Sequence, residues 1–146
     1  MKHPFQFGKD TLTVGSALAL AKGSLQGIFA DETLLRIKKS HADVADIANG
    51  DRVVYGVNTG FGPLCTTIIS REQTRKLQEN ILRSHSVGVG EHVPLEVVKL
   101  MLVTKLQALS YGYSGIAPET LDRILWFLDS NITPVVPNQG SVGASG

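Results

Sequence analysis

Residues 94–111, PLEVVKLMLVTKLQALSY, form a strongly apolar stretch in the second half of this 146-residue chain. Pro94 suits the start of a helix, and the apolar side chains that follow fall on nearly every side of that helix. A helix that is apolar all round is buried all round. A chain of this length has little room to bury such a helix, so we expect partner helices from a further segment or from other subunits.

Four further helices are predicted on either side of this stretch. A glycine can stop the first, and Asn49-Gly50 can stop the second, which Asp31 caps. Ser70 and Gln73 have the spacing of a capping box, in which two side chains bond to the free amides at a helix start. The predicted ranges are 16–22, 31–48, 70 to about 84–87, and 118 to about 130.

Short β elements are predicted near the N-terminus. Residues 5–14 alternate in polarity around a central Gly-Lys-Asp, which favours a hairpin. Arg52 to Tyr55 is too short for a helix and rich in β-forming residues, which favours a strand. Residues 56–68 and 134–146 carry glycines and prolines without a period and are predicted loops. The expected fold class is mostly α with small β elements near the N-terminus.

Composition excludes several classes of protein. Hydrophobic residues make up 42% of the chain, charged residues 18%, and the net charge is +1, which argues against a disordered tail and against a nucleic-acid-binding surface. No apolar run approaches the roughly 20 residues that span a bilayer, and the N-terminus lacks the apolar core of a signal peptide. A single cysteine, Cys65, cannot form an internal disulfide, so we expect a cytoplasmic protein without a membrane partner.

The first segment that could carry chemistry is a glycine-rich loop that begins with a tyrosine, Tyr55-Gly56-Val57-Asn58-Thr59-Gly60-Phe61-Gly62. Its glycines let the backbone approach a ligand closely, but it lacks the ending of a P-loop and the spacing of a dinucleotide-binding loop. By spacing alone it is a structural loop with a half-buried tyrosine. The alternative is a phenol placed for proton transfer, which needs a nearby positive charge or strong donors because the ordinary pKa of tyrosine is about 10.

The second such segment begins with Ser84 and His85. Neighbouring side chains on a helix point about 100° apart, so these two are not expected to form a nucleophile–base pair. The four histidines of the chain show no spacing typical of a metal site, and no metal is expected. His85 is either a structural residue at the end of its helix or a polar group that recognises the side chain of a substrate.

The third segment is Gly140 to Gly146, which by composition is a flexible tail of small residues. It also permits backbone chemistry. The amide nitrogen of Gly146 can attack the carbonyl carbon of Ala144, which closes a five-membered ring. Loss of water from the ring and from the Ser145 side chain then gives 4-methylideneimidazol-5-one, an electrophile that supplies chemistry ordinary side chains lack.

Taken together, these segments resemble the histidine/aromatic amino acid ammonia-lyase family, and they do so from about residue 5 to residue 146. The motifs that carry the resemblance occur in this order: Tyr55 to Gly62, Ser84-His85 with Gly88-Val89-Gly90, Tyr113-Ser114-Gly115-Ile116, and Gly140 to Gly146. The resemblance implies the N-terminal part of the helical ammonia-lyase fold.

The resemblance also implies catalytic residues. Ala144, Ser145 and Gly146 match the triad that cyclises by itself to 4-methylideneimidazol-5-one, with no metal. Tyr55 matches the active-site tyrosine that is assigned to proton transfer. The implied reaction is an elimination, in which the electrophile engages an amino acid, a base takes the β-proton and ammonia leaves.

Substrate-binding residues follow from the same resemblance. His85 matches the position that contacts the substrate side chain, and the loop from Asn58 to Gly62 lies beside the same pocket. The Ser84-His85 pair favours L-histidine as the small amino acid substrate, with urocanate as the product. Alternatives are L-tyrosine with coumarate as product, an aminomutase that uses the same electrophile, and a helical fragment without activity of its own.

Family members are several times longer than this chain, which ends on the third residue of the triad. We therefore expect residues 1–146 to be the N-terminal active-site domain of a longer enzyme that is active only with its C-terminal remainder. The resemblance further implies a homotetramer in which active sites are shared between subunits.

Overall fold

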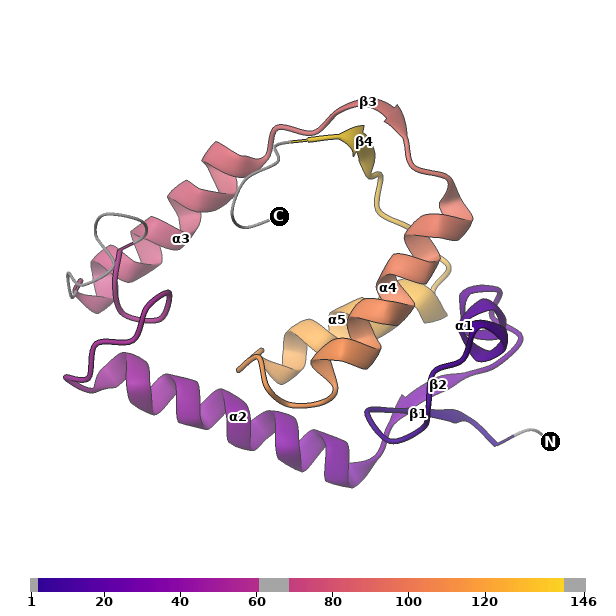
Figure 1. Cartoon of the computed structure of the whole chain (residues 1–146), viewed down its shortest axis with the longest axis horizontal. Coiled ribbons are helices and arrows are strands. Elements are labelled where there is room, and N and C mark those ends of the chain that lie inside the picture. The colour runs from indigo at the N-terminus through magenta and orange to yellow at the C-terminus, as the bar shows by residue number, and fades with distance from the viewer. Residues whose placement is uncertain (1–2, 61–68, 141–146) are drawn as a thin grey trace. The chain divides into compact units, whose positions relative to one another are not determined.

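Helices dominate the residues that the computed structural model describes, 3–60 and 69–140 (Figure 1). The helices are α1 Val14–Ala21, α2 Asp31–Asn49, α3 Arg71–His85, α4 Leu95–Leu109 and α5 Pro118–Asp129. The strands are short: β1 Phe5–Phe7, β2 Gly27–Phe29, β3 Val89–His92 and β4 Pro137–Gln139. The predicted fold class, mostly α with small β elements, is confirmed.

The chain divides into two compact units. Unit 1 combines Met1–Ala42 with His92–Val136, and unit 2 combines Asp43–Glu91 with Pro137–Gly146. Each unit therefore joins segments that lie far apart in the sequence.

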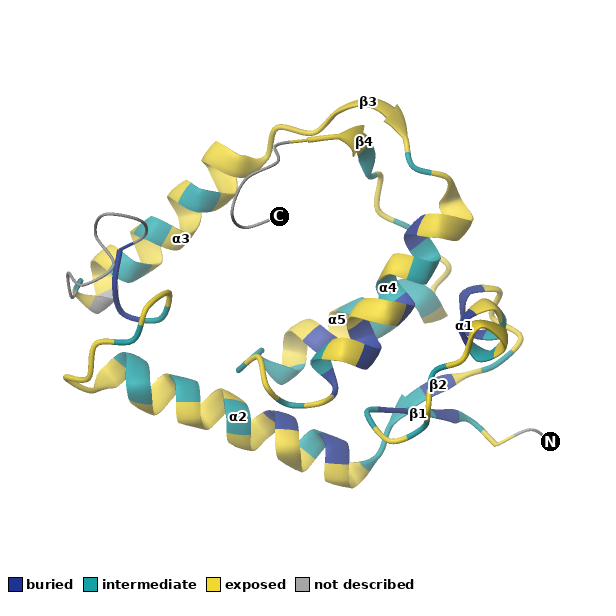
Figure 2. Ribbon diagram, in the orientation of Figure 1, coloured by how far each residue is buried: buried dark blue, intermediate teal, exposed yellow. Residues whose placement is uncertain are grey.

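Unit 1 contains the apolar core, which Figure 2 shows as dark segments on β1, α1 and α4. Helix α4 packs against both α1 and α5. Phe7, Val103 and Leu106 have no exposed surface. Burial of such side chains away from water is the main stabilising contribution to a small fold. The buried cluster consists of Phe5, Phe7, Ala17, Leu20, Ala21, Ile37, Val103, Leu106 and Leu121.

The predicted hairpin over residues 5–14 is wrong. Strand β1 pairs in parallel with β2, with Phe7 opposite Phe29 in the register. Parallel strands need a crossover connection, and α1 provides it. A Cβ atom on Gly27 would lie 2.4 Å from Cε2 of Phe7, so only glycine lets β2 approach the buried ring this closely.

The predicted strand from Arg52 to Tyr55 is also wrong, because these residues enter a turn in which the amides of Val57 and Asn58 donate to the carbonyl of Val54. Three strands of the described residues were not predicted, namely β2, β3 and β4. β3 follows α3 just beyond the range predicted for that helix, and β4 lies in the expected C-terminal loop; the two pair with each other. Glycine and proline are weak strand formers, and only a partner distant in the sequence makes them strands.

All five predicted helices form, with small shifts at their starts. Asp31 is the first residue of α2 rather than its cap, and Pro94 is the cap of α4 rather than its first residue. Within this chain α4 is not buried all round, because Leu95 is 53% exposed and Met101 is 46% exposed. Across residues 3–60 and 69–140, no helix has the length and apolar character needed to cross a membrane.

Candidate functional site

The predicted site residues that the structure describes all lie in unit 2. Tyr55 and Asn58 belong to the loop between α2 and α3, and His85 is the last residue of α3. The other four predicted site residues, Gly62, Ala144, Ser145 and Gly146, lie outside the described residues.

Asn58 organises the loop through its side chain, which is 4% exposed. Its Oδ1 atom accepts a hydrogen bond from the amide of Val54 at 2.9 Å. Its Nδ2 atom donates to the carbonyl of Arg52 at 2.8 Å and to the carbonyl of Ile47, in the last turn of α2, at 3.3 Å. A buried carboxamide must satisfy its polar atoms, and here main-chain groups of the loop and of α2 do so.

Thr59 makes a second set of contacts in the same loop, and its side chain is 2% exposed. Its Oγ1 atom accepts from the amide of Gly56 at 3.3 Å and donates to the carbonyl of Gly60 at 2.9 Å. Gly56 has a φ of +77°, a conformation that a residue with a side chain rarely adopts. The chain therefore turns sharply directly after Tyr55.

Tyr55 itself is 61% exposed. The residues on either side of it donate their amides to Asn58 and Thr59, so its backbone is held from both sides. Tyr55 is therefore more exposed than the half-buried residue that spacing alone indicated.

Helix α3 begins as the sequence predicts. The amide of Gln73 donates to Oγ of Ser70 and the amide of Ser70 donates to Oε1 of Gln73, each at 3.3 Å. These two bonds satisfy amides that have no partner within the first turn of a helix. The amide of Ile69 donates to the carbonyl of Asn58 at 3.2 Å, which joins the loop to this end of α3.

His85 lies at the other end of α3. Its Nδ1 atom is 3.0 Å from the carbonyl oxygen of Ile81 and 2.9 Å from Oγ of Ser84. The expectation that Ser84 and His85 point apart is therefore wrong, because at the helix end their side chains converge on the same carbonyl. Oγ of Ser84 also donates to this carbonyl, at 3.2 Å, so both side chains bond to the end of the helix.

The structure does not bring the described part of the loop, residues 55–60, and His85 together within this chain. Helix α3 has 15 residues, and at a rise of about 1.5 Å per residue it separates its two ends by roughly 22 Å. The loop meets the first end, and His85 forms the second. A site that uses both Tyr55 and His85 therefore needs more than these two segments of one chain.

The Tyr113-Ser114-Gly115-Ile116 motif lies in unit 1, after α4. Oγ of Ser40 accepts from the amide of Gly115 at 3.1 Å, and Nδ1 of His41 lies 2.9 Å from the carbonyl oxygen of the same residue. Both partners are on α2, so this helix holds the motif, while the Tyr113 side chain is 92% exposed.

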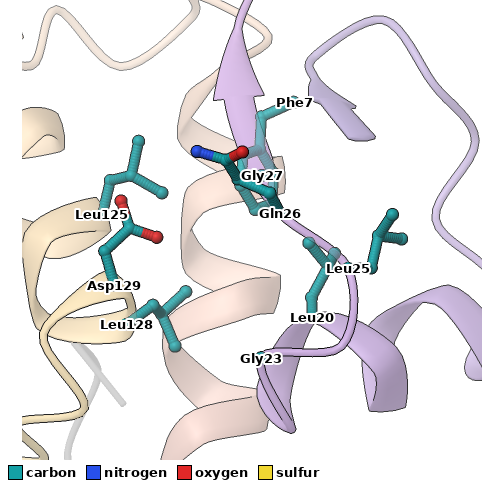
Figure 3. A pocket seen from close by; sticks show the side chains of 9 residues that line it. All are labelled: Phe7, Leu20, Gly23, Leu25, Gln26, Gly27, Leu125, Leu128 and Asp129. Carbon is teal, nitrogen blue, oxygen red and sulfur yellow. The ribbon is translucent and has the colours of Figure 1, made fainter. Parts of the chain in front are cut away.

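A hollow of about 360 Å³ lies in unit 1 beside β2 and α5 (Figure 3). Apolar side chains such as Leu20 and Leu125 form its walls, and its polar groups are the amide of Gln26 and the carboxylate of Asp129. None of the residues predicted for chemistry lines it, and we assign no function to it. In residues 3–60 and 69–140 there is also no group of three or more His, Cys, Asp or Glu that could hold a metal ion.

Thr59 lies in the loop that the sequence placed beside the pocket, but sequence reasoning assigned it no role of its own. A threonine in a glycine-rich loop often bonds through its hydroxyl to a main-chain group nearby in sequence, which is the signal that could have identified it. That signal is weak, because such bonds are also common in loops without a function.

The sequence profile of a family described as aromatic amino acid lyase matches residues 12–146. Among curated proteins, histidine ammonia-lyase from Symbiobacterium thermophilum is 44% identical over 135 residues. The match covers 92% of this chain and 27% of that protein, so the chain spans about a quarter of the length of this relative.

Solved structures of similar proteins agree with this match. Histidine ammonia-lyase from Trypanosoma cruzi superposes with a TM-score of 0.83 at 34% identity, over 95% of this chain and 27% of that one. Tyrosine aminomutase from Streptomyces globisporus superposes with a TM-score of 0.84 at 29% identity, over 95% of this chain and 26% of that one.

Proposed function

Because the chain belongs to the aromatic amino acid lyase family, we propose that it is part of an enzyme that eliminates ammonia from L-histidine to give urocanate. The observation that carries this proposal is the family match itself, which includes every residue named above for the chemistry. A relative that is 44% identical bears the name histidine ammonia-lyase, which supports histidine as the substrate.

Ala144, Ser145 and Gly146 are the proposed source of the electrophilic group. Their residue types fit the ring closure, because the small neighbours of Ser145 offer little steric resistance and Gly146 tolerates unusual backbone angles. The 4-methylideneimidazol-5-one group, once formed, would withdraw electrons from the bound amino acid. No metal takes part in this proposal.

Tyr55 is the proposed proton-transfer residue. Its exposure supports this role, because a phenol that acts on a substrate must reach it within hydrogen-bonding distance. A positioned general acid or base contributes about 10²–10⁴-fold to a rate, which is the size of effect asked of this residue.

His85 is the proposed contact to the substrate side chain through its Nε2 atom, and Gly62 is proposed to border the same pocket. The separation of His85 from the loop along α3 supports a further part of the proposal: the active enzyme is a homotetramer whose sites combine residues of different subunits. Because the chain spans 27% of its histidine ammonia-lyase relative, we also propose that further polypeptide completes each site. A cytoplasmic location is the last part of this proposal.

Two alternatives use the same electrophile. The structural similarity to a tyrosine aminomutase is the reason for both alternatives. One is that the enzyme moves the amine instead of eliminating it, and the other is that its substrate is tyrosine. Histidine is preferred because the relative with the higher sequence identity is named for it.

The test is to supply the complete enzyme with L-histidine or L-tyrosine and to compare kcat/KM for the two. We expect the ultraviolet absorbance of urocanate to appear with histidine and kcat/KM to favour histidine. Preferential formation of coumarate would make the enzyme a tyrosine lyase, and a β-amino acid product would make it an aminomutase. The absence of any product from an enzyme with a cyclised triad would refute the proposed function.

A further inference from the structure

We propose that Asn58 and Thr59 are positioning residues that hold Tyr55 in place for proton transfer. This inference rests on the proposed function of Tyr55 and adds two residues that act through it. It follows from the hydrogen bonds of the loop between α2 and α3.

Asn58 has no donor left for a substrate. A carboxamide carries two N–H donors, and those of Asn58 go to the carbonyls of Arg52 and Ile47. With 4% of its surface exposed, the residue lies inside the loop rather than at its surface. The resemblance placed Asn58 beside the substrate pocket, and these contacts assign it instead to the support of the loop.

Thr59 has likewise used its hydroxyl on the main chain. The one O–H donor goes to the carbonyl of Gly60, and a lone pair accepts from the amide of Gly56. A hydroxyl that is 2% exposed and engaged in this way fixes the local backbone.

The two side chains bracket Tyr55. The amide of its preceding neighbour Val54 donates to Asn58, and the amide of its following neighbour Gly56 donates to Thr59. Through Ile47 the bracket is also tied to α2, a rigid element. The Tyr55 Cα atom is thus located relative to a helix.

Proton transfer is sensitive to such placement. A misplacement of about 1 Å at a reacting group can lower a rate by roughly 100-fold, whereas substrate affinity depends on other contacts. Loss of the bracket should therefore lower kcat much more than it changes KM.

Thr59→Val tests this in the complete enzyme, because valine keeps the shape of threonine and removes its hydroxyl. We expect kcat to fall by roughly 10- to 100-fold with KM within about twofold of the original value. Thr59→Ser, which keeps the hydroxyl, should retain most of the rate. The matched control is Thr74→Val, which removes a threonine hydroxyl from α3 that bonds to the carbonyl of Ser70, and it should leave both constants unchanged.

A double-mutant cycle with Tyr55→Phe separates positioning from general support of the fold. If Thr59 acts through the phenol, Thr59→Val should lower the residual rate of the Tyr55→Phe enzyme by less than about twofold. An equal loss in both backgrounds overturns the positioning proposal and leaves the role of Tyr55 intact. A Tyr55→Phe enzyme with the original rate overturns the proposed function instead.

The proposal can still be tested if the Tyr55→Phe enzyme has no detectable rate or if the Thr59→Val enzyme does not fold. If the Tyr55→Phe rate lies below detection, a Thr59→Val enzyme with raised KM and unchanged kcat, or a Thr59→Ser enzyme as slow as Thr59→Val, overturns the proposal. If Thr59→Val fails to fold, Asn58→Asp replaces it. This variant keeps the size and acceptor of asparagine, loses the donors to Arg52 and Ile47, and should show the same loss in kcat.

Discussion

The Cβ atom of Ser145 becomes the methylidene carbon of the proposed electrophile, so the hydroxyl oxygen on that carbon must leave as water. Ser145→Ala cannot lose this water, and we expect turnover of histidine to vanish while the fold persists. Activity assays together with circular dichroism measure both effects.

An intact-mass measurement provides the control for this prediction. The unaltered chain should weigh two waters less than its sequence encodes, and the Ser145→Ala chain should not show this deficit. Near-normal activity in Ser145→Ala, or an unaltered chain at its full encoded mass in an active enzyme, would contradict the proposed chemistry.

Tyr55→Phe removes one oxygen atom from an exposed side chain. We expect kcat to fall by about 10²- to 10⁴-fold, since the phenol acts in the transition state, while KM changes little. Steady-state kinetics with histidine measure both constants. A variant that loses affinity but not turnover would show that Tyr55 only binds the substrate.

Residue types decided which parts of the candidate site could be predicted without a structure. Tyr55 and His85 carry chemical groups that stand out among apolar and glycine residues. Thr59 did not stand out, because its role depends on which main-chain amide faces its hydroxyl, and this is set by the turn at Gly56.

Among the elements, α3 depends strongly on the hydrogen bonds of its first turn for its stability. Much of its surface is exposed, with Leu82 at 70%, so packing within this chain stabilises it little and its cap matters more. Ser70→Ala should lower the free energy of unfolding by about 1 kcal/mol, because the amide of Gln73 loses its side-chain partner. Chemical denaturation of this chain measures the change.

Ser70→Asn is the matched control for the cap. Asparagine also offers an oxygen to the amides of a helix start, so this variant should unfold within a few tenths of a kcal/mol of the original. Equal destabilisation by both substitutions would show that the hydroxyl of Ser70 has another role.

Helices were predicted more successfully than strands for a physical reason. The cap of α3 and the proline that starts α5 act within four residues, so the local sequence contains the whole signal. Strand β1 depends instead on residues 27–29, and β3 depends on residues 137–139. A local pattern contains no information about a partner so distant, and the hairpin was the wrong choice among the possible pairings.

For the molecule as a whole, the exposed side of α4 has the largest consequence. Leu95, Val97 and Met101 are each between 44% and 53% exposed, although the helix is apolar on nearly every side. Apolar surface of this kind marks a site of contact with other protein. The proposed homotetramer, or the further polypeptide of each subunit, would cover it.

Met101→Lys tests this in the complete enzyme. A lysine in a covered interface must lose its hydration shell, so we expect the tetramer to dissociate or its thermal unfolding temperature to fall. Sedimentation analysis and thermal unfolding measure these effects. Thr120→Lys, on the exposed surface of α5, is the control and should change neither. An unaltered tetramer with unaltered stability in Met101→Lys would mean that this side of α4 faces solvent.

The sequence by itself determined the five helices, the family resemblance and the residue types of the site, because helix starts and chemical groups are local properties. Only the tertiary structure decided the parallel pairing of β1 with β2, the one-sided burial of α4 and the bracket around Tyr55. These features depend on which groups meet across a turn or between distant segments. Such meetings are settled by packing and by the need of each buried polar group for a partner.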